Sequence, residues 1–337
     1  MIEVRNLVEV YSDGTKAVDD VSFDVKEGQF FGFLGPNGAG KSTTIKVLTT
    51  LLRKTSGRVL VAGRDVDSQA NDIRKVIGVQ SQDTVLDNDL TGRENLMLQG
   101  QLQGMSGAEL KERVDELLTL VNLTDVAERR AGHYSGGMRK RLDLASALVH
   151  KPKVLFLDEP TTGLDPQSRA SIWEYLAKLN REEGITIFLT TQYMEEADKL
   201  CRQVYIIDHG KVVANGTPAE LKSEVGADSI KLSLQDGSAV NLNKKAKELL
   251  SGMNGVSSVM ESDDGLTVYA KNAGLIIADI VRAFDSNGVH LASVSFSTPT
   301  LDDVFLQHTG RRIRPEELNA KQTSGAMRFG ARRPARQ

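Results

Sequence analysis

The stretch Gly35-Pro36-Asn37-Gly38-Ala39-Gly40-Lys41-Ser42-Thr43 follows the pattern G-x-x-x-x-G-K-[ST], which is typical of a phosphate-binding loop in nucleotide hydrolases. The apolar run 30–34 before it predicts a buried strand, and 43–52 after it has a helical pattern. The glycines let backbone N–H groups turn toward phosphate oxygens, and the helix start adds partial positive charge. We therefore expect these nine residues to line the phosphates of a nucleotide, with Lys41 on the β- and γ-phosphates and Ser42 on Mg²⁺.

The composition limits the class of protein. The chain has 337 residues, enough for two domains, and its net charge of -3 gives no reason to expect nucleic acid binding. The single cysteine, Cys201, excludes an internal disulfide and lies in an apolar helical pattern, so we expect it in the core. The first nine residues do not have the pattern of a signal peptide, and no window predicts a membrane helix. We expect a soluble cytoplasmic protein that needs another chain for any membrane function.

Periodicity divides the chain into segments. Residues 1–85 favour strands and 90–150 favour helices, whereas apolar strands alternate with helices over 152–216, which predicts an α/β fold with a largely parallel sheet. A small second α/β domain is predicted over 228–309. The residues at 91–94, 106–109, 217–220 and 300–303 have the spacing of helix capping boxes.

The last stretch, 310–337, is rich in arginine and poor in large apolar residues. Such a composition predicts a disordered, solvated tail. A contact with anionic lipid or a partner is the alternative, because basic segments are attracted to such surfaces.

The run Val154-Leu155-Phe156-Leu157-Asp158-Glu159 is an apolar strand that ends in two carboxylates. Beside a phosphate-binding loop, Asp158 is expected to hold Mg²⁺ and Glu159 to face the γ-phosphate and act as the base for the attacking water. The alternative is that the two acids only solubilise the end of the strand.

With these motifs, residues 1–225 resemble the ATP-binding subunit of an ABC transporter. Tyr134-Ser135-Gly136-Gly137-Met138 is similar to the family signature, Leu-Ser-Gly-Gly-Gln. The resemblance implies a P-loop ATPase domain with a mixed-sheet core and a helical signature subdomain at about 90–150. It also implies a head-to-tail dimer, in which Ser135, Gly136 and Gly137 of one chain complete the ATP site of the other.

Three further residues are placed by resemblance. Gln82 resembles the glutamine that touches Mg²⁺ and senses the membrane partner, although Gln80 is an alternative. Tyr11 resembles the aromatic residue that stacks on adenine, with a core tyrosine as the alternative. Asp165, in Gly163-Leu164-Asp165-Pro166, resembles part of the loop that crosses the dimer interface.

The chain departs from the family pattern at Gln192, where a histidine is usual. A glutamine amide can donate a hydrogen bond to the γ-phosphate but cannot take up a proton at neutral pH. We expect Gln192 to position the phosphate. The signature departs as well, at Tyr134 and Met138, which leaves its glycines in place.

The ending Leu301-Asp302-Asp303-Val304-Phe305-Leu306 resembles the daunorubicin-resistance type of subunit. That resemblance implies ATP-driven export of drugs or other amphipathic molecules through a separately encoded permease, with the chain on the inner face of the cell membrane. Two alternatives are an ABC ATPase without a permease and a regulatory subunit with little hydrolysis.

The second domain has no recognisable catalytic group of residues. Its His290 and His308 are isolated and lack the spacing of metal ligands, so we expect ordinary surface or core histidines.

Overall fold

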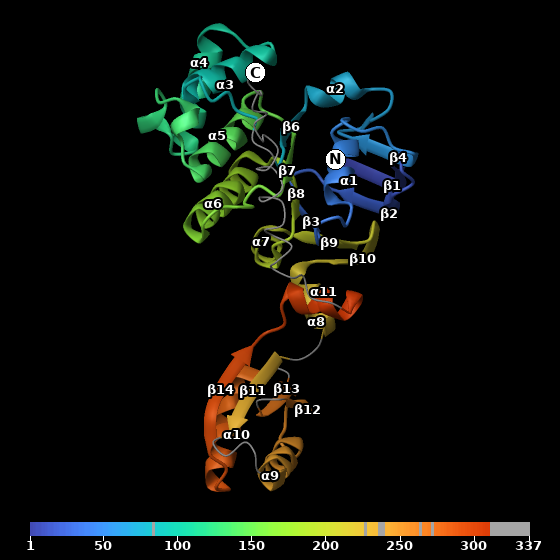
Figure 1. The fold of residues 1–337 in the computed structure, drawn as a ribbon, viewed down its shortest axis with the longest axis vertical. Helices are drawn as coiled ribbons and strands as arrows, with labels where there is room; N and C mark the ends of the chain where they lie inside the picture. The colour runs from blue at the N-terminus through green and yellow to red at the C-terminus, as the bar shows by residue number, and fades with distance from the viewer. Residues whose placement is uncertain (83–84, 226–227, 235–239, 263–264, 271–272, 311–337) are drawn as a thin grey trace, which may run out of the picture.

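The structure is a computed structural model, and it describes residues 1–82, 85–225, 228–234, 240–262, 265–270 and 273–310. For 240–245 and 261–262 it places the backbone alone. The predicted basic tail, apart from Gly310, lies outside the described residues. Figure 1 shows a large unit at the top and a small unit below it.

The centre of the large unit is a mixed sheet of six strands in the order β10-β9-β3-β8-β7-β6. The strands are β3 (Phe30–Leu34), β6 (Ile77–Gln80), β7 (Val154–Asp158), β8 (Thr186–Thr191), β9 (Gln203–Asp208) and β10 (Lys211–Gly216). All pairs are parallel except β9 with β10. Every residue of β3, β7 and β8 is buried, as expected for strands covered on both faces. The predicted α/β fold is confirmed.

An antiparallel sheet, in the order β2-β1-β4-β5, covers one face of the central sheet. Its strands are β1 (Ile2–Val10), β2 (Lys16–Val25), β4 (Ser56–Val61) and β5 (Arg64–Asp65), and the helices α1 (Lys41–Leu48) and α2 (Ala70–Arg74) lie on the same side. Aromatic rings hold the two sheets together: Phe31 stacks on Phe23 and on Phe188, with ring centroids 5.4 and 5.1 Å apart. This packing fixes β3, and therefore the loop that follows it.

Helices cover the other face of the central sheet and form a lobe to one side of it (Figure 1). They are α3 (Gly92–Leu102), α4 (Gly107–Leu120), α5 (Gly136–Leu148), α6 (Pro166–Glu183), α7 (Met194–Leu200) and α8 (Pro218–Val225), with short 3₁₀ turns at Thr124–Val126 and Ala131–His133. Thr91 forms the predicted capping box with Glu94. The box predicted at Ser106 is wrong, because the Ser106 side chain makes no capping hydrogen bond.

Cys201 lies in the core between these helices and the sheet. It is 6% exposed, and burial raises the pKa of its thiol. Gly32 of β3 makes room for it, because a Cβ at residue 32 would lie 2.6 Å from the Cys201 sulfur. The prediction of a core cysteine is confirmed.

The small unit has the β-α-β-β-α-β order of a ferredoxin-like fold. Its elements are β11 (Asp228–Leu234), α9 (Val240–Ser251), β12 (Val256–Ser262), β13 (Gly265–Ala270), α10 (Ala273–Ser286) and β14 (Leu291–Ser297). The strands form an antiparallel sheet in the order β12-β13-β11-β14. Leu232, Val268, Ile280 and Phe284 belong to its separate core.

The last described helix, α11 (Leu301–Thr309), returns to the large unit. Its residues Leu301, Val304 and Phe305 are buried in the same cluster as Leu221 of α8 and Met194 of α7. Thr300 forms the predicted capping box with Asp303 at the start of this helix. The boundaries 1–225 and 228–309 stay predictions, but α11 packs on the large unit rather than on the core of the small one.

Candidate functional site

The phosphate-binding loop joins β3 to α1 and requires glycine at two places. Gly40 has a φ of 107°, and a Cβ there would lie 2.4 Å from the backbone oxygen of Ala17. A Cβ at Gly35 would lie 2.3 Å from the backbone oxygen of Ile207. Both positions therefore exclude a side chain. The loop backbone is held tightly against the β2 and β9 regions, which gives it one fixed curvature.

Lys41 occupies the centre of the loop. Its side chain is 3% exposed, and its ammonium donates hydrogen bonds to the carbonyl oxygens of Gly35 at 2.8 Å and Pro36 at 3.0 Å. The same nitrogen lies 3.1 Å from Glu159 Oε1, whose side chain is 5% exposed. A buried cation with these acceptors is positioned to receive the oxygens of a phosphate in place of the carboxylate.

Oxygen atoms suited to Mg²⁺ converge beside the loop. Ser42 Oγ donates to Asp158 Oδ1 at 3.2 Å, and Thr190 Oγ1 donates to the same carboxylate oxygen at 2.5 Å. Hydroxyl and carboxylate oxygens are the ligands that this hard cation prefers. The residues therefore fit the ion, and the role of Asp158 is structurally supported by Thr190, which the sequence did not single out.

Glu159 follows β7 in a left-handed conformation, with a φ of 51°. Its backbone N–H donates to Thr190 O at 3.1 Å, and Thr162 Oγ1 donates to its Oε2 at 3.3 Å. Left-handed backbone is costly for a residue with a side chain and is concentrated at functional sites. The strain directs Glu159 to Lys41, whereas Asp158, one residue earlier, faces Ser42.

Gln192 directly follows β8 and is 7% exposed. The preceding residue, Thr191, accepts a hydrogen bond from the N–H of Gly35 at 3.2 Å, so Gln192 lies where β8 meets the start of the phosphate-binding loop. The carboxyl ends of three neighbouring parallel strands, β3, β7 and β8, thus bring Lys41, Glu159 and Gln192 to one edge of the sheet.

Tyr11 lies beside the same loop, with its hydroxyl 3.0 Å from Thr43 Oγ1. It is 36% exposed, so the alternative of a core tyrosine is wrong. An exposed ring next to the helix that follows the loop is free to stack on a base.

The two candidate glutamines differ in environment. Gln80 is 1% exposed and donates to the backbone oxygen of Lys140 on α5 at 3.3 Å. Gln82 is exposed, and its backbone oxygen accepts from Lys140 Nζ at 2.7 Å. The Gln80 side chain serves the contact between β6 and α5, which leaves Gln82 as the better candidate for Mg²⁺.

The signature lies at the start of α5 in the helical lobe. Ser135 is the N-cap residue, its hydroxyl accepting from the N–H of Met138 at 3.3 Å, and both Ser135 and Gly136 are exposed. Tyr134 is buried, and its hydroxyl donates to Val126 O at 2.7 Å. The tyrosine that replaces the usual leucine of the signature is therefore a packing residue of the lobe. Within the described part of the chain, no hydrogen bond joins Ser135 to the phosphate-binding loop. The open helix start can therefore serve another molecule.

Asp165 caps α6. Its carboxylate accepts from the N–H and the hydroxyl of Ser168 at 2.9 and 2.6 Å, and these bonds lower the pKa of the aspartate. Ser168 also lies near the signature: a Cβ at Gly137 would be 2.9 Å from its hydroxyl. The loop and the signature are thus adjacent within one chain.

Two buried acids were not found from the sequence. Asp143 of α5 is 8% exposed, and burial raises its pKa to about 6 while Lys140 and Gln80 oppose the shift. Glu196 of α7 is fully buried and accepts from Thr161 and Trp173 at 2.9 and 2.8 Å; burial raises its pKa. Neither residue lies in a recognised motif, so no sequence signal marked them.

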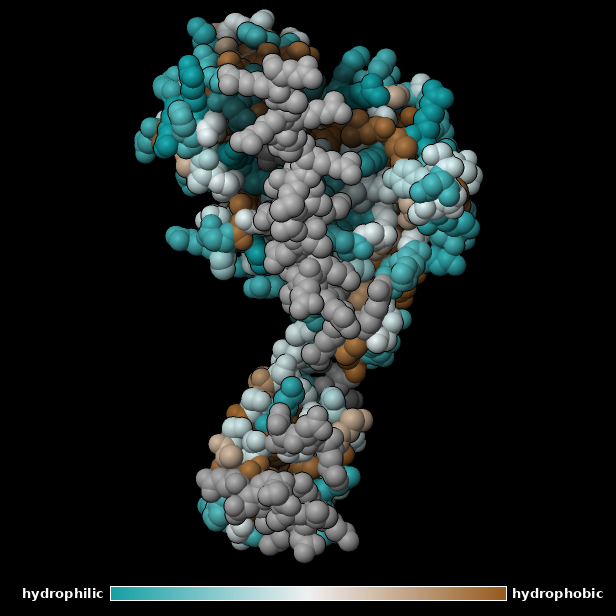
Figure 2. All heavy atoms as spheres, viewed as in Figure 1, coloured by the Kyte–Doolittle hydropathy of each residue, from teal (hydrophilic) through white to brown (hydrophobic). Residues whose placement is uncertain are grey.

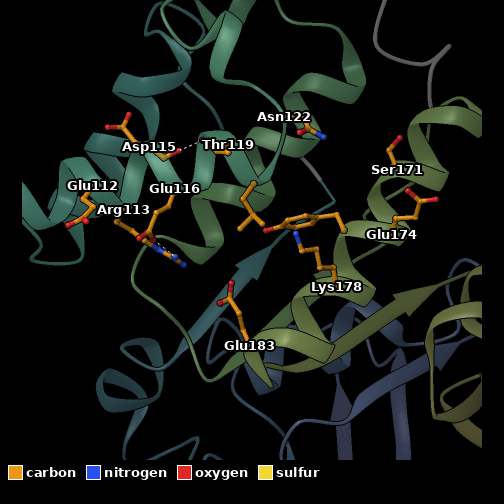
Figure 3. Close-up of a pocket in the computed structure, with 12 residues that line it drawn as sticks. Glu112, Arg113, Asp115, Glu116, Thr119, Asn122, Ser171, Glu174, Lys178 and Glu183 are labelled. Carbon is orange, nitrogen blue, oxygen red and sulfur yellow. Dashed lines mark hydrogen bonds and ion pairs between the residues drawn. The ribbon is translucent and has the colours of Figure 1, made fainter.

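A separate pocket of about 1110 Å³ lies between α4 and α6, away from all these residues. Figure 3 shows the carboxylates Glu112, Glu174 and Glu183 around it, with Arg113 bound to Glu116 at 3.1 Å. Its lining contains none of the predicted site residues. The described residues contain no group of three or more potential metal-binding His, Cys, Asp or Glu side chains.

Comparison with known proteins agrees with this geometry. The family model described as "ABC transporter" matches residues 18–162, and the model described as "ATP-binding protein DrrA1-3-like, C-terminal domain" matches 216–309. The chain is 44% identical to the daunorubicin/doxorubicin resistance ATP-binding protein DrrA of Streptomyces peucetius over 92% of each chain. It is 36% identical to the linearmycin resistance ATP-binding protein LnrL of Bacillus subtilis, over 93% of this chain and 100% of LnrL.

Export proteins are similar as well. The Nod factor export ATP-binding protein I of Paraburkholderia xenovorans is 39% identical over 93% of this chain and 98% of its own length. Among solved structures, cbiO1 from Clostridium perfringens has a TM-score of 0.62 at 31% identity, covering 66% of this chain and 90% of cbiO1. The dimeric cassette MJ0796 bound to ADP and Pi has a TM-score of 0.60 at 29% identity, covering 64% and 98%. The chain belongs to the ATP-hydrolysing, ATP-binding proteins of ABC transporters, in the group with a DrrA-like C-terminal domain.

Proposed function

We propose that two copies of this chain enclose two MgATP molecules and drive a separately encoded permease that exports drugs or other amphipathic molecules. The observation that carries the proposal is the division of the site. Lys41, Glu159 and Gln192 lie together at one edge of the central sheet, whereas the exposed signature serine Ser135 lies on the helical lobe and, in the part of the chain that the structure describes, makes no hydrogen bond to them. A second copy can supply the missing half.

In this proposal each residue of the sheet edge has one task. Lys41 and the loop N–H groups bind the phosphate oxygens and stabilise charge that develops on them. Ser42, Asp158 and Gln82 would hold Mg²⁺, whose charge offsets that of the phosphates. Glu159, released from Lys41 by the incoming phosphate, accepts a proton from the attacking water.

The rest of the site positions the nucleotide and joins the copies. Gln192 donates its amide N–H to the γ-phosphate, Tyr11 stacks on adenine, and Asp165 contributes to the contact between copies. ATP binds the closed pair better than the open one, because Ser135 and Gly137 reach the γ-phosphate only on closure. Hydrolysis removes that bridge and allows opening.

The permease and its cargo are proposed from the relatives. Proteins named for daunorubicin, doxorubicin and linearmycin resistance and for Nod factor export match along almost the whole chain. Among the described residues, no helix is long and apolar enough to cross a membrane. The chain would accordingly act from the cytoplasm, at the inner face of the membrane, on a permease in another chain.

The test is a mild-detergent purification of the tagged chain from its native host, followed by identification of the proteins bound to it. We expect a multi-span membrane protein in near 1:1 ratio. Cells that produce this pair should retain less daunorubicin than cells with the same permease and the Glu159→Gln chain. Recovery of soluble proteins alone, with none of the chain in the membrane fraction, would contradict the proposal.

A further inference from the structure

The small unit has an unprotected sheet edge. β14 is the last strand of the sheet, residues 292–297 are all exposed, and no described segment pairs with its outer side. Edge strands of stable proteins usually carry charged residues or proline that prevent pairing with another chain. The β14 sequence, LASVSFS, contains neither. Figure 2 shows pale and brown residues, rather than teal ones, over the region where Figure 1 places β14.

The register defines which groups point outward. Residues 293–297 pair regularly with β11, whereas the register shifts between the pairs formed by Ser293 and Leu291. The side-chain hydroxyl of Ser229 on β11 donates to Ser297 O at 3.4 Å, so the Ser297 carbonyl faces β11. Backbone groups alternate in direction along an antiparallel strand, so those of Val294 and Phe296 point away from β11. Among the described residues, the outer edge therefore offers two whose backbone donors and acceptors have no partner strand.

The side chains of the regular stretch are divided by face. Val294 and Phe296 lie opposite Leu232 and Ile230, on the apolar face, and they are 36% and 45% exposed. Ser293, Ser295 and Ser297 occupy the other face. If two such strands meet antiparallel around Ser295, each Val294 lies opposite the Phe296 of the other copy and each Ser293 lies opposite a Ser297. The strand is thus complementary to itself, with apolar pairs on one face and serine pairs on the other.

We propose that β14 pairs antiparallel with β14 of a second copy, centred on Ser295, so that the two small sheets become one continuous sheet. A second copy is favoured over a different chain because β14 is uncharged and complementary to itself. In the two-fold pair, each apolar side chain faces an apolar one and each serine faces a serine. It would also shield both exposed apolar side chains of each strand.

This pairing is too small to hold a dimer alone. Stable interfaces bury roughly 1,200–2,000 Å² in total, which two short strands do not reach. The proposal therefore rests on the proposed ATP-dependent dimer, because a first contact between large units raises the effective concentration of the second. The β14 pair would then form when the large units close on ATP, and it would slow their separation.

Cysteine cross-linking of the full-length chain tests the register. The natural Cys201 is buried, so Ser295→Cys introduces the one reactive thiol. Residue 295 would form a non-hydrogen-bonded pair with itself, at a Cα separation of about 4.5 Å that suits a disulfide. Met260→Cys is the matched control, since Met260 is 57% exposed at the centre of the regular stretch of β12, the opposite edge. The ATP-dependent mass of each variant is measured separately by light scattering.

We expect Ser295→Cys to form a disulfide dimer at least tenfold faster than Met260→Cys, and an added Phe296→Lys to abolish that difference. Equal rates, or a disulfide from residue 295 to a permease chain, would overturn the pairing. An ATP-dependent dimer without the Ser295→Cys cross-link would reject the β14 pair and retain the proposed function. A Ser295→Cys cross-link without any ATP-dependent change in mass would overturn the proposal as well, because the β14 pair is too small to hold a dimer without the contact between large units.

Discussion

Replacing Glu159 with glutamine should nearly abolish ATP turnover and, at the same time, increase the stabilisation that ATP gives to the protein. The reason is the buried ion pair between Glu159 and Lys41, whose nitrogen and oxygen lie 3.1 Å apart with both side chains about 95% covered. Glutamine keeps the size of the side chain and its bond from Thr162, but it cannot accept a proton or neutralise Lys41.

The magnitudes follow from the contacts. Loss of a general base lowers turnover by about 10²–10⁴-fold. Breaking a buried pair costs about 3–5 kcal/mol, but Lys41 keeps two carbonyl acceptors, so we expect about 2 kcal/mol without nucleotide. For a large unit of about 230 residues, that corresponds to a Tm lower by about 4 °C. A phosphate neutralises Lys41 in the variant without having to displace a carboxylate, so ATP should restore the lost stability.

Three measurements on the purified chain check this. Phosphate release gives turnover, titration gives the ATP Kd, and thermal unfolding with and without MgATP gives the two stabilities. Glu195→Gln is the control. Glu195 is an exposed carboxylate on α7, so this substitution removes the same charge at a place away from Lys41. This control should change turnover and the ATP Kd by less than a factor of two and should leave the Tm nearly unchanged.

A Glu159→Gln variant that hydrolyses ATP within tenfold of the natural rate would contradict the first expectation. A variant that is as stable as the natural chain without nucleotide, and gains no more stability from ATP, would contradict the second. In the first case Glu159 is not the base, and in the second the pair with Lys41 does not compete with phosphate.

Four further substitutions address other parts of the chain. Gln192→His should raise turnover less than tenfold in a phosphate-release assay, because positioning requires only the amide donor; a larger gain would assign proton transfer to this position. Tyr11→Ala should weaken ATP binding about tenfold by titration, whereas Tyr11→Phe, which keeps the ring, should stay within threefold; equal losses would remove the stacking role. Asp143→Asn should stabilise the chain in urea unfolding by up to about 3 kcal/mol at pH 7.5 but by only about 1 kcal/mol at pH 4.5. The reason is that a carboxyl whose pKa is raised to about 6 destabilises the folded state as the pH rises from the unfolded pKa through 6. A stabilisation that does not depend on pH would contradict this. Phe305→Ala should cost about 3–5 kcal/mol of unfolding free energy, while exposed His308→Ala on the same helix should cost under 0.5; similar small losses would show that α11 is not part of the core.

Motifs with a fixed local geometry could be predicted from the sequence. The phosphate-binding loop, the acidic end of β7 and the alternation of strands and helices each have a residue pattern that follows from their own backbone. The capping boxes show the limit of this reasoning. Thr91 and Ser106 have the same spacing to a glutamate, but only Thr91 forms the box. Spacing indicates what a helix start can do, and the surrounding contacts decide whether it does so.

Contacts between distant segments could not be predicted. Lys41 and Glu159 are far apart in sequence, and their pairing depends on parallel strands that bring both to one edge. Thr190 holds Asp158 because β7 and β8 are neighbours, which no local pattern reveals. Likewise, the spacing at 300–303 predicted the start of α11 but not its partner, because a local pattern does not say which core covers a helix.

The position of α11 changes how the small unit should be understood. The chain leaves the large unit after α8 and returns to it through α11, and these two helices pack together in the cluster that contains Met194 of α7. The small unit is therefore held at both of its ends by the same part of the large unit, rather than hanging from a single linker. α7 in turn follows β8 and Gln192, at the edge where ATP is proposed to bind. When two large units close, the small units would consequently move with them. A contact between the β14 edges would therefore form on closure and would slow the opening of the ATP site.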